Sequence, residues 1–259
     1  MMSAAESEFP VVGRRMLADE VYERLLEILI DGRIPADAPV SIDGMARQLA
    51  VSPTPVREAL ARLEATGLVH RVALKGYRVA PILTPEELGK LMDARRIIEG
   101  ANARIAASTS DPTFVEELGA SIRALEVAPH GPGFAELRPY WRADEQFHRL
   151  IALRADNPFL LHAFEALGGQ VQRFRLYGRS GVTDAAQAVA EHSAILDALR
   201  RNDEDAAAAA MEAHITEARR RALRDREEKL DERARRPEHD GGVEPASDDG
   251  MNSSVGQTP

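Results

Sequence analysis

From residue 84 to residue 230, the apolar residues of this chain recur at helical spacing almost without interruption. The pattern breaks at loops such as "APHGPG" and at residues that favour helix ends, which divides it into six helices. Aromatic residues make up only 5% of the 259 residues and alanine-rich runs are common, which favours packed helices over sheets. We therefore expect a mostly α-helical protein whose C-terminal part is an all-α bundle.

The ends of these six helices follow from local capping signals. Thr84 and Glu87 have the spacing of a capping box, so the first helix should run from there to about Ala107. Pro139 lies near the start of the third helix, "LRPYWRADEQFHRLIALRA". The last two helices should form a hairpin that turns near Asn202.

Residues 19–80 show a different order of elements. The segment "DEVYERLLEILID" has helical spacing, "SIDGMARQLA" follows with Ser41 as an N-cap, and a third helix starts at Ser52. After it, "LVHRVALKGYRVAPI" alternates apolar and polar residues about a turn at Lys75 and Gly76, which is typical of a β-hairpin. This order predicts a winged helix-turn-helix.

The start of the third helix, "SPTPVREAL", offers donors for an anion. Ser52 and Thr54 supply hydroxyls and Arg57 a guanidinium, beside amide groups that lack partners within the helix. This set suits a DNA backbone and a guanine edge, and Lys75 with Gly76 could enter the neighbouring minor groove. The alternative is that "SPTP" is only a helix cap and that Arg57 is a surface residue paired with an acid.

The net charge of −9 argues weakly against a nucleic-acid partner, but the charge is unevenly distributed. Residues 41–80 hold six basic and three acidic residues, a net charge of +3. The last 23 residues hold five acidic residues and no Lys or Arg, a net charge of −5. An acidic tail, which we expect to be disordered, therefore masks a basic N-terminal region.

Two absences in the sequence narrow the chemistry and the location. Without cysteine the chain can form no disulfide, Fe–S cluster or thiolate zinc site, and it has no Cys nucleophile. There is no apolar stretch of 18 residues, and the N-terminal segment has acids where a signal peptide needs a basic start. We expect a cytoplasmic protein that does not enter the membrane.

The N-terminal segment from "VYERLLEILIDGRI" to "VALKGYRV" resembles the DNA-binding domain of GntR-family bacterial transcription regulators. The most specific parts are "TPVREAL" and "LEATGLV". Pro53 stands where many relatives carry a second DNA-contacting arginine, which leaves Arg57 as the main base reader. The resemblance implies that five residues of the recognition helix and the wing tip contact DNA: Ser52, Thr54, Arg57, Lys75 and Gly76.

Four residues of the C-terminal part are candidate metal ligands. Asp144 and His148 are four residues apart, so they share one face of a helix. His192 and His214 lie about 15 and 18 Å from the turn at Asn202, at roughly 1.5 Å per residue, so the two arms place them at nearly one level. Three imidazoles and one carboxylate suit zinc, nickel or another divalent first-row ion. The alternative for each histidine is an ordinary surface or core residue.

A second pair, Arg95 and Glu99, lies on the first helix of this part. An inward arginine beside a metal would suit a carboxylate ligand, because its planar fork can bind both oxygens. The alternative is a salt bridge between the two residues on the surface of the helix.

The segments "DARRIIEGANARIAA", "DEQFHRLIALRADNPFL" and "EHSAILDALRRNDEDAAAAAMEAHI" resemble the FCD-type effector domain of the FadR subfamily, in its metal-binding, VanR-like branch. The likeness covers about residues 84–225. It implies that an arginine matching Arg95 lies beside the pocket and that the metal is held by Asp144, His148, His192 and His214.

Together these features predict a homodimeric repressor rather than an enzyme. It would bind a double-stranded, pseudo-palindromic DNA operator, and a small carboxylate effector held near the metal would control that binding. The expected organisation is a flexible N-terminus (1–18), a winged helix-turn-helix (19–82), an effector domain (84–230) and an acidic tail (231–259).

Two other functions would fit part of this pattern. A metal-dependent hydrolase would need a general base facing the metal, yet Glu145 follows Asp144 directly and so points about 100° away around the helix. A helical scaffold with incidental histidines would carry no stoichiometric metal.

Overall fold

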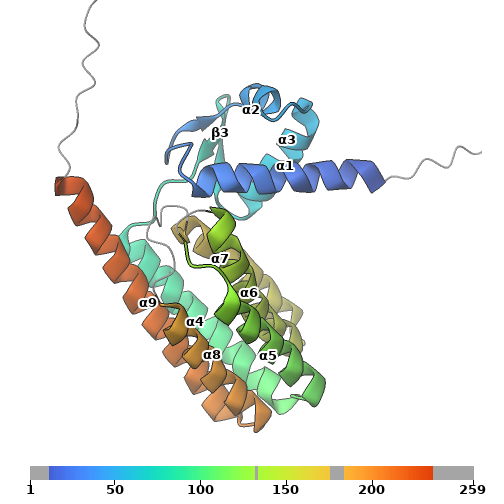
Figure 1. The fold of residues 1–259 in the computed structure, drawn as a ribbon, viewed down its shortest axis with the longest axis vertical. Helices are drawn as coiled ribbons and strands as arrows, with labels where there is room; N and C mark the ends of the chain where they lie inside the picture. The colour runs from blue at the N-terminus through green and yellow to red at the C-terminus, as the bar shows by residue number, and fades with distance from the viewer. Residues whose placement is uncertain (1–11, 132–133, 176–183, 236–259) are drawn as a thin grey trace, which may run out of the picture.

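The computed structural model describes residues 12–131, 134–175 and 184–235 of the chain. The predicted fold class is confirmed: a small helical unit with a three-stranded sheet precedes a bundle of helices (Figure 1). Among the described helices, none combines the length and the apolarity that a bilayer crossing requires.

The N-terminal unit has the predicted order of three helices followed by a hairpin, with one additional short strand. Ser41 caps the second helix by accepting the Gly44 N–H at 3.0 Å, as its position predicted. The additional strand pairs antiparallel with the second strand of the hairpin, so the sheet order is β1-β3-β2. The elements are α1 (Val12–Ile30), β1 (Pro39–Val40), α2 (Ile42–Gln48), α3 (Pro53–Ala65), β2 (Val69–Val72) and β3 (Gly76–Val79).

Helix α1 begins earlier than the sequence pattern predicted. Residues 12–18, expected to be a flexible N-terminus, are helical. Ala18 is buried one turn before Val21, so it extends the apolar stripe that the prediction started at residue 19. No proline or glycine follows Gly13 before that stripe, and nothing there stops the helix.

The turn of the hairpin also differs from the prediction. The Lys75 N–H donates to the Val72 carbonyl at 3.0 Å, so the turn is closed before Gly76, which is the first residue of β3. Leu74 has a φ of 63° and a fully exposed side chain. The turn therefore comprises residues 73–75, with Leu74 in its middle. The predicted tip residue Lys75 lies within this turn, and Gly76 lies just after it. The reason is that Leu74 adopts a left-handed conformation that propensity assigns to glycine.

All six helices predicted after the hairpin are present among the described residues. The capping box is formed: Thr84 accepts the Glu87 N–H, and the Glu87 carboxylate accepts the Thr84 N–H. The helices are α4 (Pro85–Ser108), α5 (Pro112–Val127), α6 (Phe134–Arg154), α7 (Pro158–Arg175), α8 (Ala185–Arg200) and α9 (Glu204–Arg235).

Two helix borders in the bundle were predicted wrongly. Helix α6 begins at Phe134, so Pro139 lies inside it rather than in its first turn. Burial of Phe134 and Leu137 extends the apolar stripe backwards, and this packing outweighs the single hydrogen bond that proline removes. Helix α9 continues to Arg235, whereas the acidic tail was expected from residue 231; residues 236–259 of that predicted tail lie outside the described part.

Each half of the molecule has its own apolar core. In the N-terminal unit, the core lies between α1, α3 and the sheet and includes Leu25, Leu60 and Val79. In the bundle, α4 packs along α9 and a larger core includes Phe147 and Ile195 (Figure 1). Helix α9 also packs on α8, and α6 packs on α4 and α5. The helices α6, α8 and α9 each carry buried polar side chains.

Candidate metal centre and nucleic-acid interface

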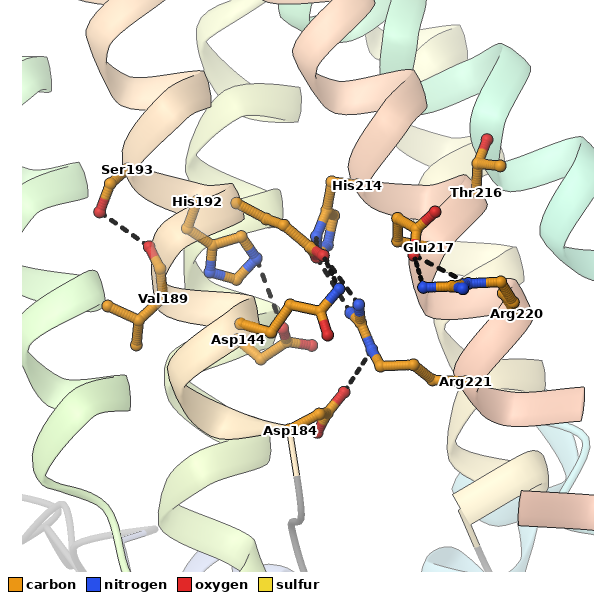
Figure 2. A network of polar contacts seen from close by, with 12 residues as sticks. Asp144, Asp184, Val189, His192, Ser193, His214, Thr216, Glu217, Arg220 and Arg221 are labelled. Carbon is orange, nitrogen blue, oxygen red and sulfur yellow. Dashed lines mark hydrogen bonds and ion pairs between the residues drawn. The ribbon is translucent and has the colours of Figure 1, made fainter. Parts of the chain in front are cut away.

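The four predicted metal ligands converge in the interior of the bundle. Asp144 and His148 come from α6, His192 from α8 and His214 from α9, and all four are buried. One donor atom from each lies within 4.8 Å of the other three. Nε2 of His192 lies 3.6 Å from Oδ1 of Asp144 (Figure 2), and Nε2 of His148 lies 3.9 Å from the same oxygen. With bonds of about 2.1 Å, neighbouring ligands of a tetrahedral ion are about 3.4 Å apart, so the two spacings from Asp144 are close to those around one first-row ion.

Two carboxylates behind the cluster orient two of the imidazoles. Nδ1 of His148 lies 2.6 Å from Glu99, and Nδ1 of His214 lies 2.7 Å from Glu191. A carboxylate at Nδ1 keeps the ring proton on that nitrogen, which leaves the Nε2 lone pair for the centre. This arrangement is common for histidines that bind metals in proteins.

The protonation states also suit metal binding. Burial, followed by the neighbouring imidazoles, lowers the pKa of His192 well below its usual value. Burial likewise lowers the pKa of His214, against the opposing effect of Glu191. Both rings are therefore neutral at neutral pH and can donate a lone pair. Nε2 of His148 and both ring nitrogens of His192 are buried without a hydrogen-bond partner among the described residues, and a cation would satisfy the inward-facing ones.

Arg95 and Glu99 form the predicted i,i+4 salt bridge at 2.6 Å, but it is buried rather than on the surface. Burial alone would raise the pKa of Glu99, but Arg95 and His148 lower it to about 2. The two oxygens of Glu99 thus face different groups, Oε1 the arginine and Oε2 the histidine. The pair joins α4 to the ligand cluster on α6.

Sequence reasoning missed three residues that support the cluster from the other side. Arg221 donates to both oxygens of Glu191 at 2.7 and 3.0 Å, and its Nε lies 2.5 Å from Asp184 (Figure 2). Burial would raise the pKa of Glu191, but hydrogen bonds from His214 and Arg221 lower it to about 2. Two signals were present in the sequence: Glu191 directly precedes His192, and Arg221 follows His214 by seven residues on the same helix.

The predicted DNA contacts lie on the surface of the N-terminal unit. Ser52, Thr54 and Arg57 are exposed at the start of α3, and Lys75 and Gly76 are exposed beside the wing tip. Ser52 occupies the N-cap position but its side chain makes no capping hydrogen bond, and Arg57 forms no ion pair with any described residue. Within the described part of the chain, neither interaction required by the purely structural alternative is formed.

Comparisons with known proteins agree with this architecture. The model of the bacterial regulatory proteins of the gntR family matches residues 17–79, and the FCD domain model matches residues 90–217. A probable D-xylose utilization operon transcriptional repressor of Paenarthrobacter nicotinovorans is 32% identical over 204 residues, which cover 78% of this chain and 87% of that protein. The transcriptional repressor RspR of Escherichia coli (strain K12) is 27% identical over 199 residues, covering 76% of this chain and 85% of the repressor.

A solved structure shows the same fold. E. coli McbR/YncC aligns with a TM-score of 0.66 over 81% of this chain and 98% of its own, at 20% identity. Fold and site together define a two-part transcription regulator with an N-terminal helix-turn-helix and a C-terminal FCD domain. The chain belongs to the GntR family of bacterial regulatory proteins. Its relatives are transcription regulators and not enzymes, so the hydrolase interpretation is set aside.

Proposed function

We propose that this regulator is a cytoplasmic homodimeric repressor of the FadR subfamily whose operator binding is controlled by a small carboxylate at a divalent metal. The observation that carries the proposal is the buried cluster of Asp144, His148, His192 and His214, whose outer carboxylates hold two imidazoles in the metal-binding tautomer. A bound zinc or nickel ion would supply a Lewis-acidic attachment point for a carboxylate.

The residues around the cluster have distinct roles in this proposal. Arg95 is buried beside Glu99 and close enough to Asp144 for their charges to interact, so it would bind the carboxylate of the effector together with the metal. Glu99 would complete the effector site from behind by holding both Arg95 and His148. The relative named for a D-xylose utilization operon favours genes of carbon catabolism as the regulated target.

The DNA-binding half would act as a pair in the homodimer. The two copies of α3 would enter successive major grooves of a pseudo-palindromic operator, with Ser52, Thr54 and Arg57 at the DNA and Lys75 and Gly76 beside the wing tip. An effector would shift the dimer toward a geometry that no longer spans both half-sites.

Elemental analysis of the purified protein tests the metal centre directly. We expect about one zinc or nickel ion per chain, and loss of this ion in the His192→Ala variant. The exposed histidine His162 offers a matched control, because His162→Ala should keep the ion. Protein that retains no metal after dialysis against metal-free buffer, even when zinc was supplied during growth, would contradict the proposal.

A further inference from the structure

The contact between the two halves of the molecule centres on one carboxylate of α1. Glu23 pairs through Oε2 with Arg138 at 2.7 Å and through Oε1 with Arg142 at 2.9 Å, and both arginines lie on α6. The side chains of Glu23 and Arg138 are 31% and 33% exposed, so this part of the contact is shielded from solvent more than a surface ion pair. We call Glu23, Arg138 and Arg142 the Glu23 clamp.

Two further contacts accompany the clamp. The Phe134 N–H at the start of α6 donates to the Asp31 carboxylate at 3.3 Å. At the end of α3, Gly67 lies so close to the Gln170 side chain of α7 that an added Cβ would be 2.1 Å from its nitrogen. Among the described residues, contacts between the two halves therefore include two on α6 and one on α7.

The clamp continues to the recognition helix through α1. Arg62 of α3 pairs with Asp19 at 2.6 Å and lies over the ring of Tyr22 at 4.1 Å. Tyr22 directly precedes Glu23, so α1 contacts α6 and α3 through adjacent side chains. A displacement of α1 relative to α6 would therefore change the contacts that Arg62 of α3 makes with α1.

On its other side the clamp is continuous with the candidate metal centre. Arg138 and Arg142 precede Asp144 by six and two residues on the same helix, about 9 and 3 Å along its axis. His148 lies one further turn on and is also a ligand. Arg142 lies on the same continuous stretch of α6 as Asp144 and His148, after Pro139, so a shift of these two residues toward an ion also displaces Arg142, whereas Arg138 lies just before the proline.

We propose that the Glu23 clamp couples occupancy of the metal centre to the DNA-binding half, with α6 as the connecting rod. This inference rests on the proposed metal centre. The clamp is suited to such coupling because each oxygen of Glu23 binds its own arginine, so a small change in the position of α6 changes both ion pairs together. A clamp that served only as structural support would hold α1 on α6 to the same extent with and without the ion.

Hydrogen exchange of the full-length protein tests the coupling, with zinc ion alone as the probe. We expect zinc to slow amide exchange in α6 around residues 140–150 and also in α1 around residues 19–31. In the Glu23→Gln variant, α6 should still respond, but the response of α1 should be lost. The matched control is Glu27→Gln on the same helix, because Glu27 pairs only with Arg24 and Arg33 among the described residues.

The possible outcomes separate the clamp from the metal centre. An α1 response that persists in Glu23→Gln, or that is missing from the wild type while α6 responds, overturns the clamp and leaves the metal centre intact. If zinc alters amide exchange in α6 in none of the proteins, the proposal of a metal centre is contradicted, and the proposed coupling is contradicted with it. Charge reversal provides a rescue: Glu23→Arg with Arg138→Glu and Arg142→Glu should restore the α1 response that Glu23→Gln loses.

Discussion

Two carboxylates, Glu99 and Glu191, contact imidazoles of the candidate metal site from outside the proposed ligand set. Removing the negative charge of Glu191 should destabilise the His214 tautomer that is protonated at Nδ1, while all four proposed metal ligands stay in place. We expect Glu191→Gln to lower zinc affinity by about 10–100-fold, measured by competition with a chromogenic chelator. Glu217→Gln is the control, because Glu217 lies on α9, the helix of His214, and pairs with Arg220 instead. Equal zinc affinities for the two variants would show that Glu191 does not support metal binding.

At the DNA-binding face, Arg57 is the side chain that should matter most for sequence recognition. A guanidinium that bonds a guanine edge contributes about 1–3 kcal/mol of discrimination, so Arg57→Ala should weaken operator binding by roughly 5–150-fold. Binding to unrelated DNA should change much less, because phosphate contacts dominate there. Titration of labelled operator and of scrambled DNA measures both. Arg123→Ala, a change at an exposed arginine of α5, is the control, and a wild-type affinity for Arg57→Ala would assign base reading to another residue.

The metal cluster shows what residue spacing can and cannot reveal. Asp144 and His148 could be assigned to one face from a four-residue interval, and His192 and His214 to one level from their distances to the turn. Arg221 and Asp184 were not identified, because Arg221 of α9 reaches Glu191 of α8 and its N-cap residue Asp184 from a distant part of the chain. Only the rotation of α8 and α9 about their axes brings those side chains together, and that rotation is set by packing of the core.

Helix starts that carry a local signal in the sequence were predicted best, and those that depend on burial alone were predicted worst. Ser41 and Thr84 cap α2 and α4 through hydrogen bonds to backbone N–H groups, and both residues were predicted as caps from the sequence. Helices α1 and α6 begin at Val12 and Phe134, where the sequence offers no capping pair and only the buried stripe extends the helix. Caps act locally and can be read from the sequence, whereas burial depends on the assembled core.

The cap of α5 carries a testable pH dependence. Asp111 accepts the Phe114 N–H at 2.9 Å and the Arg154 guanidinium at 2.7 Å, and these two bonds lower its pKa below the usual value. A carboxyl with a lowered folded-state pKa stabilises the fold above its unfolded pKa of about 3.9 and loses that effect as the pH falls through the folded value. We expect Asp111→Ala to lower the urea midpoint at pH 7 and to approach the wild type near pH 3. Glu117→Ala, at an exposed residue of the same helix, should show no such convergence.

At the scale of the whole molecule, the candidate metal centre also links helices that are far apart in the sequence. Its four ligands join α6, α8 and α9, and Glu99 adds α4, so an ion bound there stabilises only the folded bundle. Linkage then predicts stabilisation by about 2.7 kcal/mol at a zinc concentration one hundred times the Kd. This should raise the thermal midpoint of wild-type protein, measured by calorimetry before and after chelator treatment.

The variant that separates a specific centre from general zinc effects is His192→Ala. His192 is fully buried between Asp144 and the other two imidazoles, so its removal deletes a ligand without altering the surface. We expect His192→Ala to lose the zinc-dependent rise in midpoint, whereas His162→Ala, at an exposed histidine of α7, should retain it. Because a single bundle core contains all the ligands, the rise should appear as one cooperative transition of the C-terminal half. A rise of equal size in both variants would mean that zinc acts elsewhere on the surface, and the cluster would then be a set of core histidines.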